Sequence, residues 1–173
     1  KSLTTRENLT IGIGKAISAL DKSLFDRVRL LAVSSTLATN SVVEGKGCRV
    51  GLIVIGHEAV PNIPVDEIVQ LRGGHNLEGV RKNELDLDGA REFVCSVKDK
   101  VDAFAISSYL SVRNPEHEIA VRELVKSLAP YPVVCGHELS SALGFHERTI
   151  TAVLNARLIP IITDLIASIK NVR

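Results

Sequence analysis

Two short apolar runs, rich in β-branched residues, constrain most strongly what this chain can fold into. They span Val28 to Val33 and Val50 to Ile55, with little polar interruption. Strands that are covered by helices on both faces of a parallel sheet have such near-continuous apolar sequences. The residues between the two runs leave room for one short helix. This order of strand, helix and strand predicts an α/β fold with a mostly parallel sheet and flanking helices.

A cluster of hydroxyl and amide side chains follows the first run, at Ser34, Ser35, Thr36, Thr39 and Asn40. In open parallel sheets, ligands collect at the carboxyl ends of the strands, and the unpaired N–H groups of a helix start attract anions. The same residue types are also ordinary N-cap and turn residues. The cluster therefore predicts either a ligand-lining site or helix capping alone, and both interpretations stay open.

Composition and charge exclude several classes of protein. The 173 residues are 45% hydrophobic and 24% charged, which is typical of one main globular domain. A net charge of +1, without a Lys/Arg cluster, argues against binding to nucleic acid or an anionic membrane. No stretch is expected to span a membrane, and the first ten residues lack the apolar core of a signal peptide. We therefore expect a cytoplasmic protein.

The three cysteines, Cys48, Cys95 and Cys135, are odd in number, have no close spacing and lie in or beside apolar segments. Buried free thiols in a reducing compartment are the expected state, without a disulfide framework.

The remaining chain predicts further alternation of helices and strands. A stretch from Gly56 to Glu84 is rich in Gly and Pro and has little periodicity, which indicates an excursion or a lid. Within it, Arg72 to Asn76 favours a solvated loop over an anion-binding turn. The expected elements are helices from Leu9 to Leu20, from Asp86 or Asp88 to Val97 and from Asn114 to Leu128, and strands over Val101–Ser107 and Pro132–Cys135.

A last helix is predicted from Thr149 to Lys170, kinked or restarted at Pro160. Its apolar residues have too little sheet left to cover. We therefore expect an α/β domain over residues 1–145, and a helix over residues 146–173 that leads into another domain or docks on a partner.

Three segments resemble the hydantoinase/oxoprolinase family. In SSTLATNSVVEGKG the matching residues are Thr36, Ala38, Thr39, Asn40, Glu44 and Gly47. The family's histidine and glycine before this motif correspond here to Val33 and Ser34. In the Asn-Pro-x-His-Glu helix start, the matches are Asn114, Pro115, His117 and Glu118. In the third segment they are Glu138, Ser140, Gly144, Glu147, Arg148, Thr149, Thr151, Asn155 and Ala156.

The resemblance implies an actin-like, ribonuclease-H-like ATPase architecture that uses ATP and Mg²⁺. It also implies ATP-dependent hydrolysis of a cyclic amide, or carboxylation of a ketone. Independently of the resemblance, the apolar C-terminal helix predicts a homo-oligomer or a partner subunit that docks on it. The family's acidic, glycine-rich phosphate loop is not found in these residues, so the 173-residue chain alone is expected to be inactive. The alternative is a non-catalytic module that binds a small molecule or a partner subunit.

Six residues are candidates for substrate or phosphate binding: Thr36, Thr39, Asn40, Glu147, Arg148 and Thr149. Arg148 can pair with a phosphate or carboxylate through two hydrogen bonds, while hydroxyls and an amide can hold a small polar ring. The alternative for Glu147 to Thr149 is a structural cap at a domain junction. No catalytic residue is assigned. Four His-Glu pairs occur, but none extends to His-Glu-x-x-His, so no metal site is predicted.

Overall fold

The computed structural model describes residues 9–30, 32–59 and 61–171, which divide into two compact units. The larger unit comprises residues 46–159, and the smaller unit comprises residues 1–45 together with 160–173. Helix α5 (Phe145–Asn171) begins in the larger unit and ends in the smaller one. The predicted boundary between residues 145 and 146 therefore falls inside the larger unit, because the first half of α5 packs on its sheet.

The larger unit is built on a four-stranded sheet in which all neighbouring strands are parallel, in the order β2-β1-β3-β4. The strands are β1 (Val50–Ile55), β2 (Glu67–Leu71), β3 (Ala103–Ser108) and β4 (Val133–Cys135). The chain passes from β1 to β2 on one side and then to β3 on the other. The carboxyl ends of β1 and β3 therefore form a topological switch point, where ligands bind in sheets of this kind.

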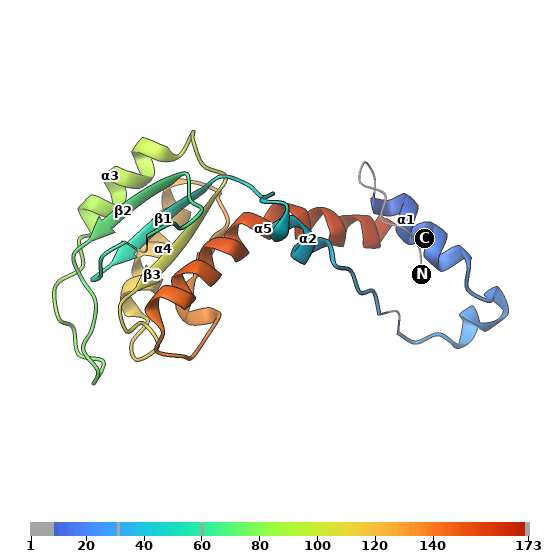
Figure 1. Ribbon diagram of the computed structural model, residues 1–173, viewed down its shortest axis with the longest axis horizontal. Coiled ribbons are helices and arrows are strands. Elements are labelled where there is room, and N and C mark those ends of the chain that lie inside the picture. Colours follow the sequence, from blue (N-terminus) through green and yellow to red (C-terminus); the bar gives the residue numbers. More distant parts are fainter. Residues whose placement is uncertain (1–8, 31, 60, 172–173) are drawn as a thin grey trace. The chain divides into compact units, whose positions relative to one another are not determined.

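Helices cover both faces of this sheet (Figure 1). On one face, α3 (Leu87–Val97) and α4 (Glu116–Leu128) pack against side chains such as Ile53, Phe104 and Ile106. On the other face, the first half of α5 packs against alternate strand residues, including Leu52 and Val54. All six residues of β1 are buried, which explains the uninterrupted apolar run in the sequence.

Most elements expected in the larger unit are confirmed. Strand β1 has the predicted bounds, and β3 and β4 overlap the predicted strands. The Asp86 side chain caps α3 by accepting a hydrogen bond from the backbone N–H of Gly89 (2.9 Å). At the start of α4, Asn114 Oδ1 accepts a hydrogen bond from the backbone N–H of Glu116 (3.0 Å).

The strand predicted over Val28–Val33 is wrong for the residues that the structure describes. Residues 28–30 and 32–33 form neither helix nor strand, and the Leu30 side chain is 84% exposed. A strand needs a neighbour for its backbone hydrogen bonds. The described part of the smaller unit offers none, because its elements are α1 (Leu9–Ser18), the 3₁₀ helix η1 (Lys22–Arg27), α2 (Leu37–Val43) and the end of α5. The sequence also offers Thr4 and Thr5 as candidate N-caps of the helix predicted from Leu9, but both lie outside the described residues.

Strand β2 was missed, because it lies within the stretch predicted to be an excursion. Its residues alternate between exposed and less exposed positions. Its first residue, Glu67, pairs with the Lys100 ammonium (3.4 Å). An edge strand has one free side and tolerates polar residues, so it lacks the continuous apolar signal of β1.

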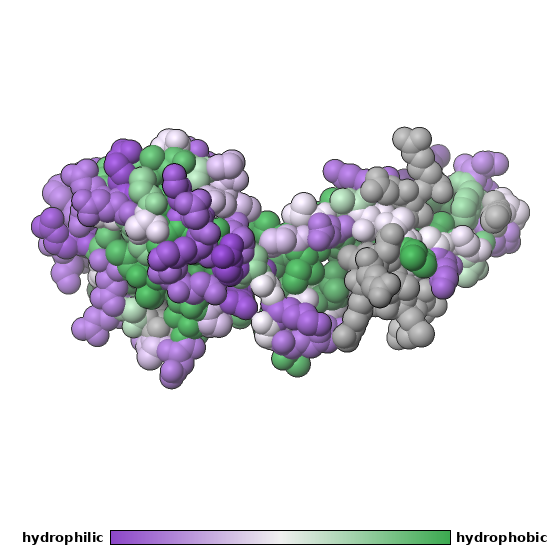
Figure 2. Space-filling view, turned by 90° about the horizontal axis from the view of Figure 1, so that it is seen from above, coloured by the Kyte–Doolittle hydropathy of each residue, from purple (hydrophilic) through white to green (hydrophobic). Residues whose placement is uncertain are grey.

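Both edges of the sheet are short or polar. Edge strand β4 has three residues and follows Pro130 and Pro132, neither of which has a backbone N–H to donate. Hydrophilic residues also cover much of the face of the larger unit that Figure 2 presents.

Helix α5 is long and apolar enough to cross a membrane by length and composition alone, with a mean hydropathy that reaches 1.6 between Phe145 and Lys170. The expectation that no stretch reaches this length is therefore wrong. One such helix is weak evidence. Helix α5 packs Ala152, Val153 and Ala156 against the sheet, but only 17% of its apolar window is buried. The absence of a membrane partner stays a prediction.

We predict that Gly56→Ala destabilises the larger unit more than Gly79→Ala. Both glycines have a positive φ, at 71° and 79°, but an added Cβ at Gly56 would lie 2.6 Å from the carbonyl oxygen of Gly73. At Gly79 the nearest atom is 3.4 Å away. Urea unfolding should show a loss of about 1–2 kcal/mol for Gly79→Ala and about 2–4 kcal/mol for Gly56→Ala. Equal losses would contradict the close approach at Gly56.

Candidate functional site

The three candidate residues of the smaller unit lie at the start of α2. Thr36 occupies the N-cap position without a side-chain capping bond, and Ser35 Oγ accepts from the backbone N–H of Leu37 instead (3.1 Å). The Asn40 side chain donates to Thr36 Oγ1 (3.4 Å). Thr36, Thr39 and Asn40 are exposed. No strand precedes these residues in the described part of the chain. Ser35 is explained by its capping contact, whereas the side chains of Thr39 and Asn40 are accessible to a ligand.

Arg148, in the larger unit, is buried and already uses most of its hydrogen-bond donors. Nη1 donates to the carbonyl oxygens of Ala142 (2.9 Å) and Gly144 (3.4 Å), and Nη2 donates to that of Ser108 (3.3 Å). Burial lowers the pKa of Arg148, and the charge of Glu118 opposes this shift. Only Nε is buried without a partner. A pairing with phosphate through both Nη groups would compete with these carbonyls, whereas Nε–H is still available to donate.

The neighbours of Arg148 differ from one another in accessibility. Thr149 is buried, donates from Oγ1 to the Phe145 carbonyl oxygen (2.7 Å) and lies 2.7 Å from Ser107 Oγ. Because its own proton is used, Thr149 accepts the proton of Ser107. Glu147 is exposed. Thr149 therefore joins α5 to β3, while Glu147 alone of the three faces solvent.

The six candidates fall into two groups that belong to different compact units. Each group is local: one lies at the start of α2 and the other at the start of α5.

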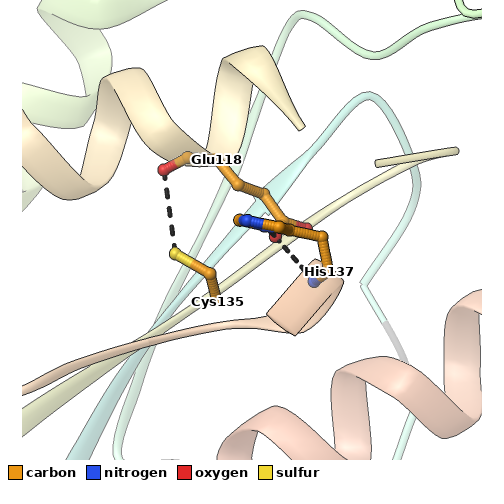
Figure 3. Close-up of side chains that lie close together, drawn as sticks. All are labelled: Glu118, Cys135 and His137. Carbon is orange, nitrogen blue, oxygen red and sulfur yellow. Dashed lines mark hydrogen bonds and ion pairs between the residues drawn. The ribbon is translucent and has the colours of Figure 1, made fainter. Parts of the chain in front are cut away.

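A buried carboxylate, which the sequence analysis did not select, organises the carboxyl end of the sheet. Glu118 in the first turn of α4 is fully buried. Its Oε1 accepts from the backbone N–H of Ser108 (2.7 Å), and its Oε2 accepts from the backbone N–H of His137 (2.9 Å). Oε2 also lies 2.6 Å from His137 Nδ1 (Figure 3). Glu118 thus joins α4 to the ends of β3 and β4.

Glu118, Cys135 and His137 form the one group of three potential metal ligands among the described residues, with ligand atoms within 4.8 Å of one another. Two observations favour a hydrogen-bonded network over a metal site. Both Glu118 oxygens are already bonded, and burial raises the pKa of the Cys135 thiol to about 12. Metals bind the thiolate, whereas this neutral thiol points to the carbonyl oxygen of Glu118 (3.9 Å).

Glycines bring the loops after β1 and β2 into close contact at the same edge. Gly56, after β1, packs against Gly73 and Gly74, after β2, where any Cβ would clash. The expectation of a solvated loop over Arg72–Asn76 is wrong for its centre, because Gly73, Gly74 and His75 are buried. Arg72 and Asn76 are exposed.

Two buried imidazoles lie together at this edge. The rings of His75 and His117 are 4.3 Å apart between centroids, and burial lowers the pKa of both. The backbone N–H of Gly74 donates to His117 Nδ1 (3.0 Å), so neutral His117 carries its proton on Nε2. The lone pair of Nδ1 is thus occupied by the Gly74 N–H, and the protonated Nε2 has none to offer a metal. His117 is therefore an unsuitable metal ligand. His75 has no hydrogen-bond partner for either ring nitrogen.

We predict that Glu118→Gln destabilises the larger unit by about 3 kcal/mol, because it leaves Arg148 buried without its counter-charge. An amide also cannot accept at both of its ends from Ser108 and His137. Glu123→Gln on the same helix is the control, since Glu123 is exposed and pairs only at the surface with Arg122 and Lys126. Its loss should stay under about 1 kcal/mol in the same urea titration. Similar losses for both variants would contradict the assigned role of Glu118.

The cysteines predict an order of alkylation. Cys95 is exposed, Cys48 is half-buried with a pKa raised by burial, and Cys135 is buried; the expectation that all three are buried is thus wrong for Cys95. Iodoacetamide reacts with the thiolate, and a thiol with a raised pKa, such as Cys135, forms little thiolate at about pH 8. Iodoacetamide should therefore modify Cys95 first and Cys135 only after unfolding. Mass spectrometry of peptides measures the order, with Cys95→Ser as control. Modification of Cys135 in the folded protein at the same rate as Cys95 would show that Cys135 is not buried in solution.

Comparisons with known proteins agree with the motifs in the sequence. A family model described as the hydantoinase/oxoprolinase N-terminal region matches residues 1–129. The acetophenone carboxylase gamma subunit of Aromatoleum aromaticum is 30% identical over 91% of this chain and 28% of that protein. The caprolactamase subunit alpha of Pseudomonas jessenii is 28% identical over 73% of this chain and 22% of that protein.

Solved structures give the same relationship. The ATP-dependent caprolactamase from Pseudomonas jessenii superposes with a TM-score of 0.74 and 25% identity, over 93% of this chain and 27% of that one. The nucleotide-free acetone carboxylase structure has a TM-score of 0.80 at 20% identity, over 98% and 30%, and supports the fold alone. The chain spans less than a third of the length of these proteins. With a family match over residues 1–129 of 173, the chain belongs to the hydantoinase/oxoprolinase family, through its N-terminal region.

Proposed function

We propose that this chain is part of an ATP-dependent enzyme that either hydrolyses a cyclic amide or carboxylates a ketone. The family match over residues 1–129 carries the proposal. The relatives supply the two chemistries: a caprolactamase and a 5-oxoprolinase on one side, and an acetophenone carboxylase on the other. The caprolactamase is described as ATP-dependent.

In such an enzyme, the γ-phosphoryl group of ATP is transferred to the oxygen of an amide or ketone, and ADP is released. In an amide this makes the carbonyl carbon more reactive toward water. A ketone also loses an α-proton and gives an enol phosphate, whose α-carbon forms the new bond to CO₂. The developing negative charge requires Mg²⁺ and positively charged or N–H groups around the phosphates. In this chain, Asn40 and the neighbouring hydroxyls are the accessible candidates for contact with the substrate or phosphate. We further propose a partner subunit, since two relatives are named as subunits, and a cytoplasmic location, which suits three free cysteines.

The alternative is a non-catalytic module that binds a small molecule or a partner subunit. The buried, already bonded Nη groups of Arg148 favour a structural role for that residue and so leave this alternative open.

ATP consumption by the protein that contains this chain, together with any subunits that co-purify, tests the proposal. Phosphate release should depend on one of two substrate sets: caprolactam, 5-oxoproline and hydantoin, or acetone and acetophenone with bicarbonate. The isolated 173-residue chain should release no phosphate above the buffer background. A protein that binds these compounds without consuming ATP would support the non-catalytic alternative.

We predict that Asn40→Ala lowers turnover at least about tenfold, the equivalent of one lost hydrogen bond to the reacting molecule (about 1.4 kcal/mol). Asn40 is exposed and makes one weak side-chain contact, so the melting temperature of the Asn40→Ala variant should hardly differ from that of the wild type. Asn155→Ala is a matched control, because Asn155 is exposed and bonds only within α5. Normal turnover with a lowered melting temperature would show that Asn40 is structural.

A further inference from the structure

Every buried side-chain nitrogen or oxygen without a partner, among the described residues, lies in a residue at the carboxyl edge of the sheet. The atoms are His75 Nδ1 and Nε2, Ser108 Oγ, Ser111 Oγ and Arg148 Nε. A buried polar atom without a partner costs about 1–3 kcal/mol, so such atoms are few in native proteins and require an explanation. Their concentration at one edge indicates that water or a ligand completes their hydrogen bonds there.

One turn links these residues. It spans residues 108–111, beginning at the last residue of β3, and its Ser111 N–H donates to the Ser108 carbonyl oxygen (3.2 Å). The same oxygen accepts from Arg148 Nη2 (3.3 Å), and the His75 N–H donates to the Tyr109 carbonyl oxygen (3.4 Å). Ser108 and Ser111 therefore belong to this turn, and the Arg148 side chain bonds to its backbone. His75 is joined to the turn by its backbone N–H, while its ring lies against that of His117.

The turn is also strained. Leu110 has a φ of 55°, in the left-handed region that residues other than glycine, asparagine and aspartate rarely adopt, and it is nearly buried. Such conformations persist where the surroundings enforce them, and they concentrate at binding sites. The turn follows β3 at the topological switch point with β1, where Tyr109 N–H donates to the Ile55 carbonyl oxygen (2.8 Å).

The geometry points to a binding site for a small oxyanion, a phosphate group, at the turn over residues 108–111. Arg148 Nε–H, the hydroxyls of Ser108 and Ser111, and one N–H of His75 are all donors, and a phosphate accepts several hydrogen bonds at once. The first turns of α4 and α5, which carry Glu118 and Arg148, add positive helix ends at this edge.

The donor set explains the choice of ligand. A metal ion is disfavoured because Arg148 is cationic and neither a guanidinium nor His117 offers a free lone pair. The carboxylate of Glu118 does not satisfy these donors, because it accepts from Ser108 N–H and His137 instead. The site does not depend on the proposed enzymatic activity, since Asn40 and ATP turnover play no part in it.

Binding can be measured on the 173-residue chain by the ¹⁵N signals of the His75 imidazole. Inorganic phosphate, with chloride at matched ionic strength as the reference, should shift these signals and raise the melting temperature, because a ligand of the folded state stabilises it. A second titration with ATP distinguishes the sources: a response to both identifies a free phosphate site, and a response to ATP alone identifies the phosphate of a nucleotide.

Ser111→Ala separates the site from the fold. Its hydroxyl has no partner, so removal should not lower stability, but phosphate should bind at least about tenfold more weakly through the loss of one hydrogen bond. Ser127→Ala is the control, because that exposed hydroxyl bonds within α4 (2.7 Å). If neither phosphate nor ATP moves the His75 signals, or if Ser111→Ala binds like the wild type, the proposal fails, and trapped water is the partner of these atoms.

Discussion

Removal of the Glu118 carboxylate from water costs several kcal/mol, and the structure of the carboxyl edge follows from how that cost is offset. Two backbone N–H groups and one imidazole bond to its oxygens, so Ser108 and His137 must lie where they do. Ser108 in turn presents its carbonyl oxygen to Arg148, whose charge balances that of Glu118. The three backbone oxygens around Arg148 are then fixed as well. One buried charge thus specifies the ends of β3 and β4 and the start of α5.

The larger unit could be predicted from the sequence because its signals are local. The run from Val50 to Ile55 contains no polar residue, and Asp86 and Asn114 stand where α3 and α4 begin. Strand β2 could not be identified in this way, because an edge strand has the alternating pattern of a polar loop with a few apolar residues. The run from Val28 to Val33 has the opposite problem. It has a strand composition, but backbone pairing is a property of two segments, and composition describes only one.

The ligand-binding role of the six candidate residues stays a prediction. Arg148 and Thr149 were selected as ligand-binding residues, and the structure shows both engaged with the backbone or with Ser107. Glu118 was passed over because a His-Glu pair at a helix start also suits capping, and its partners lie 10 and 19 residues away in the sequence. His75, Ser108 and Ser111 have no motif at all. What distinguishes them is the absence of hydrogen-bond partners after folding, a property that no sequence pattern contains.

The two edges of the sheet have a consequence for how this protein associates with others. An open parallel sheet can grow by addition of a strand from another molecule, which leads to fibres or exchanged dimers. Here the edge strand β4 is only three residues long and follows two prolines. The other edge strand, β2, carries Glu67, which is paired to Lys100. The backbone is thus a poor template for a further strand. Side chains on the helices and loops of this α/β unit are therefore better suited than its strand edges to contact another molecule.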